Sequence, residues 1–174
     1  MKKKNGFTLV ELLAVIVVLA IIMIIAIPTV LDVMNNARKS SFVLYAEKVI
    51  NAVQTQYLYD AGLGSIAGAG YYVYDITSDL ELTSTGDYRG YVVVNAIDVD
   101  NVEYILFLYD NNYMITNYNV TQNGMPTTDN GSIAAYDASF ISSQAASSAV
   151  ACQAAAGSQA TCYNRNGYII VSAN

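Results

Sequence analysis

The sequence contains no histidine and no tryptophan among its 174 residues. Histidine is the commonest general base and a frequent metal ligand, so its absence excludes Ser-His-Asp and Cys-His catalytic sets. The sequence also lacks the glycine-rich loop followed by Lys and Ser or Thr that holds nucleotide phosphates. These absences predict a protein that is not an enzyme and that uses no cofactor.

Basic residues are scarce. The chain has 8 basic and 14 acidic residues, which gives a net charge of −6. Three of the basic residues are Lys2, Lys3 and Lys4, and the remainder of the chain has 5 basic and 14 acidic residues, a net charge of −9. A chain with so large an excess of acidic residues is poorly suited to bind the phosphates of nucleic acid, which are also negatively charged. We therefore expect no direct contact with nucleic acid.

Two further kinds of site have weak signals. Asp98, Asp100 and Glu103 offer oxygen ligands for calcium, but their spacing does not match an EF-hand loop, and acidic turns are usually just solvated. We therefore predict no metal site. Residues 119–121 and 130–132 fit the acceptor pattern for N-glycosylation, which occurs often by chance.

A long apolar run near the N-terminus dominates the sequence. Residues 12–27 contain no polar side chain, and Pro28 and Thr29 are the only interruptions before Leu31. As a helix, these 20 residues span about 30 Å, the thickness of a bilayer core. The lysines at positions 2–4 would keep the N-terminus on the cytoplasmic side.

A secretory signal peptide and a plain membrane anchor both explain part of this run. The run is longer than a typical signal-peptide core, and no small-x-small cleavage site follows it cleanly. A plain anchor explains the length but not Glu11. A carboxylate at the centre of a spanning helix costs about 2.5–3.5 kcal/mol, and less near the helix start.

Residues 6–13 read GFTLVELL, which resembles the class III signal of type IV prepilins and pseudopilins. The resemblance extends through the apolar run to Pro28, where helices of this family carry a kink-forming proline. It implies that a prepilin peptidase cleaves between Gly6 and Phe7 and methylates the new amine of Phe7. It also implies that Glu11 pairs with the N-terminal amine of a neighbouring subunit during assembly.

The proposed pairing of Glu11 is physically reasonable. An unpaired carboxylate is costly in a low dielectric, and a nearby amine offsets much of that cost. A staggered neighbour supplies one amine for each carboxylate. Such a head-to-tail contact does not close on itself, so it generates a helical filament and specifies the axial register of its subunits.

The helix is expected to continue well beyond the apolar run. Residues 32–59 contain neither Gly nor Pro, and apolar residues recur at helical spacing along one face. We expect a helix from Phe7 to Tyr59, bent or locally opened at Pro28 and stopped by the glycines at 62 and 64. The members of the apolar stripe are Phe42, Ala46, Val49, Val53 and Tyr57.

The remainder of the sequence favours an antiparallel sheet. Residues 91–97, 102–109 and 113–120 are predicted strands, and the short turns between them indicate a meander whose apolar face covers the helical stripe. Residues 61–88 are predicted to be a surface loop that contains one short strand. Residues 132–161, rich in Ala and Ser, fit either a short helix or a low-complexity linker.

The two cysteines lie close together near the C-terminus, and a final strand over residues 168–171 follows them. In an exported chain, a close pair such as Cys152 and Cys162 indicates a disulfide, and pilins commonly carry a C-terminal disulfide-bounded loop. Free thiols in a reducing environment remain the alternative. A loop this short stabilises the fold by about 2–4 kcal/mol.

Together these features predict an α+β, pilin-like fold in which a long N-terminal helix packs on an antiparallel sheet. Its segments are a leader (1–6), a membrane and filament-core helix (7–31), an amphipathic half-helix (32–60) and a globular β-rich region with a C-terminal disulfide-bounded part (61–174). The leading hypothesis is a structural subunit of a type IV pilus, which waits in the cytoplasmic membrane and is then assembled on the cell surface.

This hypothesis implies particular partners. They are other copies of the chain, the peptidase, an assembly ATPase and a platform membrane protein. The filament would serve adhesion, motility or DNA uptake. The alternatives are a pseudopilin of a type II secretion or competence system, and a membrane-anchored surface binding protein that never polymerises and keeps its N-terminus uncleaved.

Overall fold

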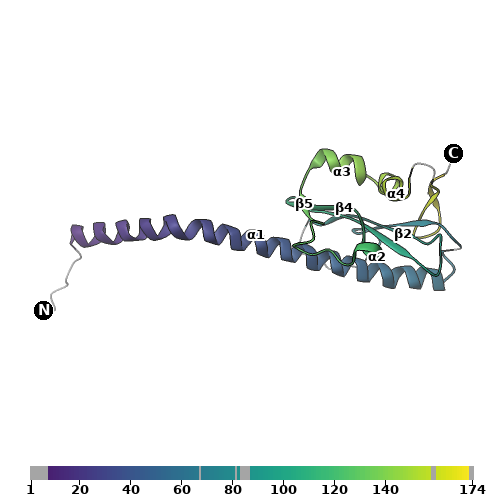
Figure 1. The fold of residues 1–174 in the computed structure, drawn as a ribbon, viewed down its shortest axis with the longest axis horizontal. Coiled ribbons are helices and arrows are strands. Elements are labelled where there is room, and N and C mark those ends of the chain that lie inside the picture. The colour runs from purple at the N-terminus through teal and green to yellow at the C-terminus, as the bar shows by residue number, and fades with distance from the viewer. Residues whose placement is uncertain (1–7, 67, 81, 83–86, 158–159, 173–174) are drawn as a thin grey trace. The chain divides into compact units, whose positions relative to one another are not determined.

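The computed structural model describes residues 8–172, apart from 67, 81, 83–86 and 158–159 (Figure 1). The lysines at positions 2–4 and the Gly6–Phe7 junction therefore lie outside the described residues. The chain divides into two compact units, residues 1–39 and residues 40–174. We call the second unit the head.

One helix, α1 (Leu9–Gly62), contributes to both units. Its sequence contains no internal glycine, and its one proline, Pro28, does not end it. The helix ends three residues later than Tyr59, the predicted end. Gly64 follows it at φ 75°, and the amide of Ser65 donates to the carbonyl of Asp60 at 3.0 Å. A left-handed glycine just beyond the last turn is a common way to satisfy the final carbonyls of a helix.

The head is built on a seven-stranded sheet of order β5-β4-β3-β2-β1-β6-β7. All neighbouring strands are antiparallel except β1 and β6, which are parallel. The α+β fold and the predicted central meander are thus confirmed. The strands are β1 (Tyr71–Asp75), β2 (Arg89–Asn95), β3 (Glu103–Tyr109), β4 (Tyr113–Asn119), β5 (Ala134–Ala135), β6 (Cys162–Asn164) and β7 (Ile169–Val171).

One face of the sheet packs on the part of α1 that belongs to the head. Every residue of the predicted stripe is buried there, from Phe42 to Tyr57. The stripe shares a core with alternate residues of the central strands, because successive strand side chains point to opposite faces. These strand residues are Tyr72, Tyr74, Val92, Val94, Leu106, Leu108 and Ile115.

The opposite face of the sheet has a second core. Figure 1 shows α3 (Ala138–Gln144) and α4 (Ser148–Ala156) on the side of the sheet away from α1. The side chains of Asp137 and Ser147 cap the two helices by accepting amide hydrogen bonds. Over the described residues, the helical alternative for 132–161 is therefore correct and the linker alternative is wrong. A four-residue helix, α2 (Val120–Asn123), follows β4 directly.

The short strand that the sequence allowed within residues 61–88 is β1, but it is part of the sheet and not of a surface loop. Strand β1 lies inside the sheet between β2 and β6, and Val73 and Tyr74 are buried on its two faces. The glycines on either side of this short strand gave the whole segment the composition of a loop. The strand is stable because both of its edges are paired, which its local sequence does not reveal.

Candidate functional site

The start of α1 places Glu11 against Thr8. The amide of Thr8 donates to Oε2 of Glu11 at 2.8 Å, and its hydroxyl donates to the same oxygen at 3.0 Å. In return, the amide of Glu11 donates to Oγ1 of Thr8 at 3.3 Å. This reciprocal arrangement is a capping box, which satisfies amides that have no partner inside the helix. Sequence reasoning missed this local role, although the Thr-x-x-Glu spacing is its known signal.

The apolar segment of α1 after Glu11 presents its side chains outward. This part of α1 is long and apolar enough to cross a membrane, and none of it is buried. Large side chains such as Leu13, Ile22 and Ile25 are each more than half exposed. An apolar surface of this extent requires lipid or other apolar helices around it, because in water it is an aggregation liability.

Pro28 lies inside this exposed segment. Proline has no amide hydrogen, so the carbonyl four residues earlier, that of Ile24, loses its helical partner. The helix therefore lacks one backbone hydrogen bond between Ile24 and Pro28, in the second half of the apolar run. A bend or opening at Pro28 stays a prediction.

Cys152 and Cys162 form a disulfide in the structure. The bond joins α4 to β6, and both cysteines are fully buried in the second core, with Val73, Val93 and Phe107. It thus holds α4 on the face of the sheet that α1 does not cover. The described part of the chain contains no free cysteine.

Asp60 is a buried charged residue that sequence reasoning missed. Its carboxylate lies 3.5 Å from the guanidinium of Arg165, and it accepts hydrogen bonds from Tyr74 at 3.2 Å and from Gln56 at 2.8 Å. Burial and the neighbouring carboxylate of Asp60 raise the pKa of Tyr74. One signal in the sequence could have indicated that Asp60 is buried. It lies three residues after Tyr57 and therefore on the helical face that carries the apolar stripe.

The acidic residues considered for calcium do not converge. Oδ1 of Asp98 accepts the amide of Asp100 at 3.1 Å, which shapes the turn. Glu103 accepts from Gln122 at 2.6 Å and from Asn95 at 2.9 Å, and these hydrogen bonds lower the pKa of its carboxyl. Within the described ranges, no group of three His, Cys, Asp or Glu side chains is placed to hold a metal ion.

Both asparagines of the glycosylation patterns have structural roles. Oδ1 of Asn119 caps α2 by accepting the amide of Gln122 at 3.1 Å. The side chain of Asn130 donates to the hydroxyl of Tyr118 at 3.1 Å and accepts from the amides of Thr127 and Ser132. The side-chain amides of Asn119 and Asn130 are thus already hydrogen-bonded within the turns in which they lie.

Comparison with protein families explains the N-terminal segment. Residues 1–27 match the family described as the prokaryotic N-terminal methylation motif. The chain carries the class III signal of type IV pilins. The resemblance inferred from residues 6–13 is thereby confirmed. A search of curated proteins found no match to the chain, and neither did a search of solved structures.

The methylation motif supports a pilin-like or pseudopilin-like protein. Proteins of this type are generally structural and not enzymatic, and they generally assemble at a membrane and polymerise. The exposed apolar segment of α1 is consistent with anchoring in a membrane. The N-terminal segment, from the motif to the end of the apolar run, is therefore the candidate functional site.

Proposed function

We propose that this chain is a structural subunit of a type IV pilus. A prepilin peptidase cleaves it between Gly6 and Phe7 and methylates the amine of Phe7, and the mature chain polymerises through its N-terminal helix. The observation that carries the proposal is the combination of the methylation motif with an apolar helical segment that nothing in the described chain buries.

The apolar segment has two successive environments in this proposal. It first holds the precursor in the cytoplasmic membrane, where lipid covers side chains such as Leu13 and Ile22. It then enters the filament core, where neighbouring helices replace the lipid. An assembly ATPase and a platform membrane protein drive this transfer. The missing backbone hydrogen bond at Pro28 lets the helix adjust to packing in the core.

Glu11 sets the register between subunits. In the isolated chain its carboxylate satisfies the amide and hydroxyl of Thr8. Cleavage places a new amine on Phe7, the residue directly before Thr8. In the filament, the carboxylate accepts the amine of the neighbouring subunit, since a buried carboxylate needs a positive partner. The register is fixed because only one axial offset pairs every carboxylate with an amine.

The head forms the outer surface of the filament. Its two cores and its buried disulfide suit a domain that must stay folded outside the cell. Its exposed turns contact the surroundings of the cell and set adhesion, motility or DNA uptake.

The decisive experiment is mass analysis of the mature protein from its native cell, together with electron microscopy of filaments sheared from the surface. We expect a mature chain that begins at methylated Phe7 and is the building block of the filaments. An intact Met1 would overturn the proposal in favour of a plain membrane anchor. A processed chain that never leaves the envelope as a filament would identify a pseudopilin.

A further inference from the structure

The turn between β2 and β3 presents an unusual surface. Residues 97–101 are all exposed, and apolar and acidic side chains alternate along them. Ile97 is 55% exposed and Val99 is 69% exposed, and Asp98 and Asp100 flank Val99. We call residues 97–101 the acidic turn.

The shape of the acidic turn is fixed by its own hydrogen bonds. The amide of Asn101 donates to the carbonyl of Asp98 at 3.1 Å, and the amide of Ile97 donates to Oδ1 of Asn95 at 3.2 Å. Docking onto a rigid surface loses less conformational entropy than docking onto a mobile one. The acidic turn is therefore suited to contact a partner without refolding.

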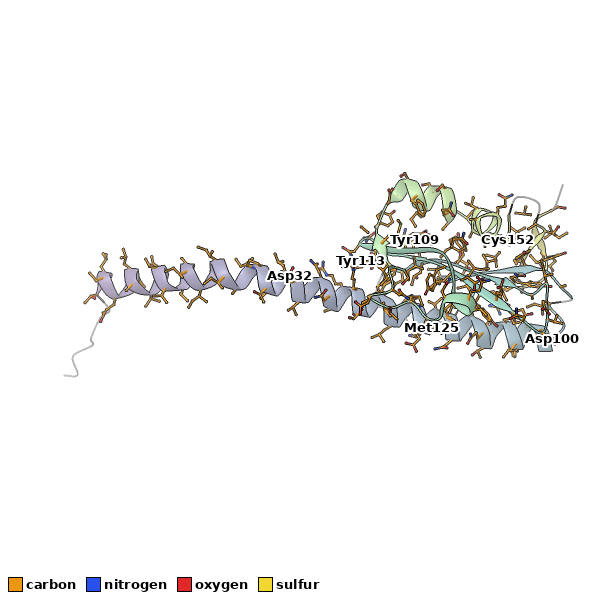
Figure 2. The ribbon with its side chains drawn as sticks, viewed as in Figure 1. Asp32, Asp100, Tyr109, Tyr113, Met125 and Cys152 are labelled. Atoms are coloured by element: carbon orange, nitrogen blue, oxygen red, sulfur yellow. A yellow bond between two sulfur atoms is a disulfide. The ribbon has the colours of Figure 1, made fainter. Side chains whose placement is uncertain are left out.

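The acidic turn lies at the end of the head where α1 ends. Tyr88, just before β2, contacts Phe42 near the start of the head's helix, with 6.0 Å between the ring centroids. Val94, near the end of β2, pairs with Tyr72, whose ring lies 6.3 Å from that of Tyr57. Strand β2 thus runs in the same direction as the part of α1 in the head, and Figure 2 shows Asp100 at the end of the head where α1 ends.

A surface of opposite charge lies on α1 just before the head. Arg38 and Lys39 are the only adjacent pair of basic residues after position 6. Met34 lies one helical turn before Arg38 on the same face and is 46% exposed, and Val33 beside it is 63% exposed. Among the residues that the structure describes, neither Arg38 nor Lys39 forms an ion pair. We call residues 33–39 the basic collar.

We propose that the acidic turn of one copy docks on the basic collar of a second copy. This inference rests on the proposed filament function. The two surfaces carry opposite charges, and both also carry exposed apolar side chains. The chain without its first six residues has a net charge of −9, so copies repel one another overall and a contact between opposite charges offsets part of that repulsion. Two different patches on each copy give a heterologous contact, which extends as an open filament.

The docking contact uses different residues from the pairing of Glu11 with the amine of Phe7. The two contacts can therefore join one copy to two different neighbours in the filament.

Charge exchange tests the docking in cells that assemble the filament. The variants are Asp100→Lys, Arg38→Glu and the chain with both changes, and Asp129→Lys in another exposed turn is the matched control. We expect each single reversal to lower the yield of sheared filaments several-fold, the double reversal to restore it, and Asp129→Lys to leave it unchanged. Single variants with the yield of the control, or a double variant without recovery, would overturn the inference.

Measuring the processed chain in the membranes of the same cells distinguishes docking from a role of the basic collar at the membrane surface. The amount of processed chain in the membrane should be equal for all variants. If Arg38→Glu lowers that amount and Asp100→Lys has no effect on filaments, the collar serves the membrane surface and the docking proposal is wrong. If the unaltered chain forms no filaments, the proposed function itself fails.

Cross-linking supplies a second measurement that does not depend on charge. Val99→Cys combined with Met34→Cys should give a ladder of covalent multimers from oxidised filaments on non-reducing gels. Asp129→Cys combined with Met34→Cys should give none. The native cysteines do not interfere, because both are fully buried. Filaments of the first variant that remain monomeric on the gel would refute the contact.

Discussion

The guanidinium of Arg165 lies 3.5 Å from the carboxylate of Asp60, although 105 residues separate them. Arg165 also donates from Nη1 to the carbonyl of Asp79 at 2.7 Å. It therefore connects the end of α1, the segment after β1 and the turn between β6 and β7. The Asp60 side chain is only 6% exposed, so its charge depends on this partner.

Arg165→Met should destabilise the head by about 2–3 kcal/mol, because it leaves a buried carboxylate with only neutral hydrogen-bond donors. The free energy of unfolding is measured by urea denaturation of the full chain in detergent micelles. Arg89→Met is the matched control, since Arg89 is exposed and forms no described ion pair. Equal destabilisation by the two variants would contradict the role of Arg165.

Asp79 should make the stability of the head depend on pH. Burial raises the pKa of its carboxyl above the ordinary 3.8, despite the amide of Asp75 and the charge of Arg165, which lower it. Below the unfolded pKa, the group is neutral in both states and costs nothing. As pH rises through the folded pKa, the partly buried carboxyl ionises and the folded state loses stability.

Asp79→Asn should therefore raise the melting temperature at pH 7 and leave it nearly unchanged at pH 3. The amide oxygen of asparagine can still accept the hydrogen bond from Asp75, which the carboxylate accepts at 2.8 Å. Asp129→Asn in an exposed turn serves as the control. A gain at pH 3 as large as that at pH 7 would show that ionisation of Asp79 is not the cause.

Gly90 is a position where only glycine fits. Its φ is 145°, and a Cβ atom there would lie 2.0 Å from the carbonyl oxygen of Phe107 on β3. Gly90→Ala should cost about 3 kcal/mol through backbone strain and displacement of β3. Urea denaturation measures the loss, and Gly62→Ala, where no atom lies within 4 Å of the added Cβ, should cause none.

Periodicity made part of this fold predictable. The stripe that includes Phe42 and Tyr57 repeats at helical spacing, and the strands from β2 to β4 are separated by turns with strong local signals. In these elements the local preference and the tertiary environment agree. The predicted bounds of these three strands were accordingly within about two residues of the observed ones, and the helix ends three residues beyond the predicted end.

Long-range pairing was not predictable in the same way. The parallel contact between β1 and β6 joins Tyr71 to Cys162, and no local pattern records it. Helices α3 and α4 consist mainly of Ala and Ser, whose weak hydrophobic contrast hides which face is buried. At the N-terminus, the motif pointed to Glu11 but not to its bonds with Thr8.

The disulfide between Cys152 and Cys162 should contribute about 3 kcal/mol to the head, because it closes a loop of ten residues in the unfolded chain. Replacing both cysteines with serine should lower the urea midpoint accordingly. In the unaltered chain, the bond should resist reductant under native conditions, since both cysteines are fully buried. Equal midpoints with and without the bond would contradict this contribution.

Glu11→Gln separates the capping role of residue 11 from its role in assembly. Glutamine keeps an acceptor for the amide and hydroxyl of Thr8, which lie 2.8 and 3.0 Å from the carboxylate, but it has no charge to pair with an amine. We expect normal insertion and cleavage of Glu11→Gln and Glu11→Ala, and few or no filaments from either, by electron microscopy. Thr8→Ala, which weakens the cap and keeps the charge, should still assemble. Normal filaments from Glu11→Gln would reject the charge pairing and leave Glu11 only the cap.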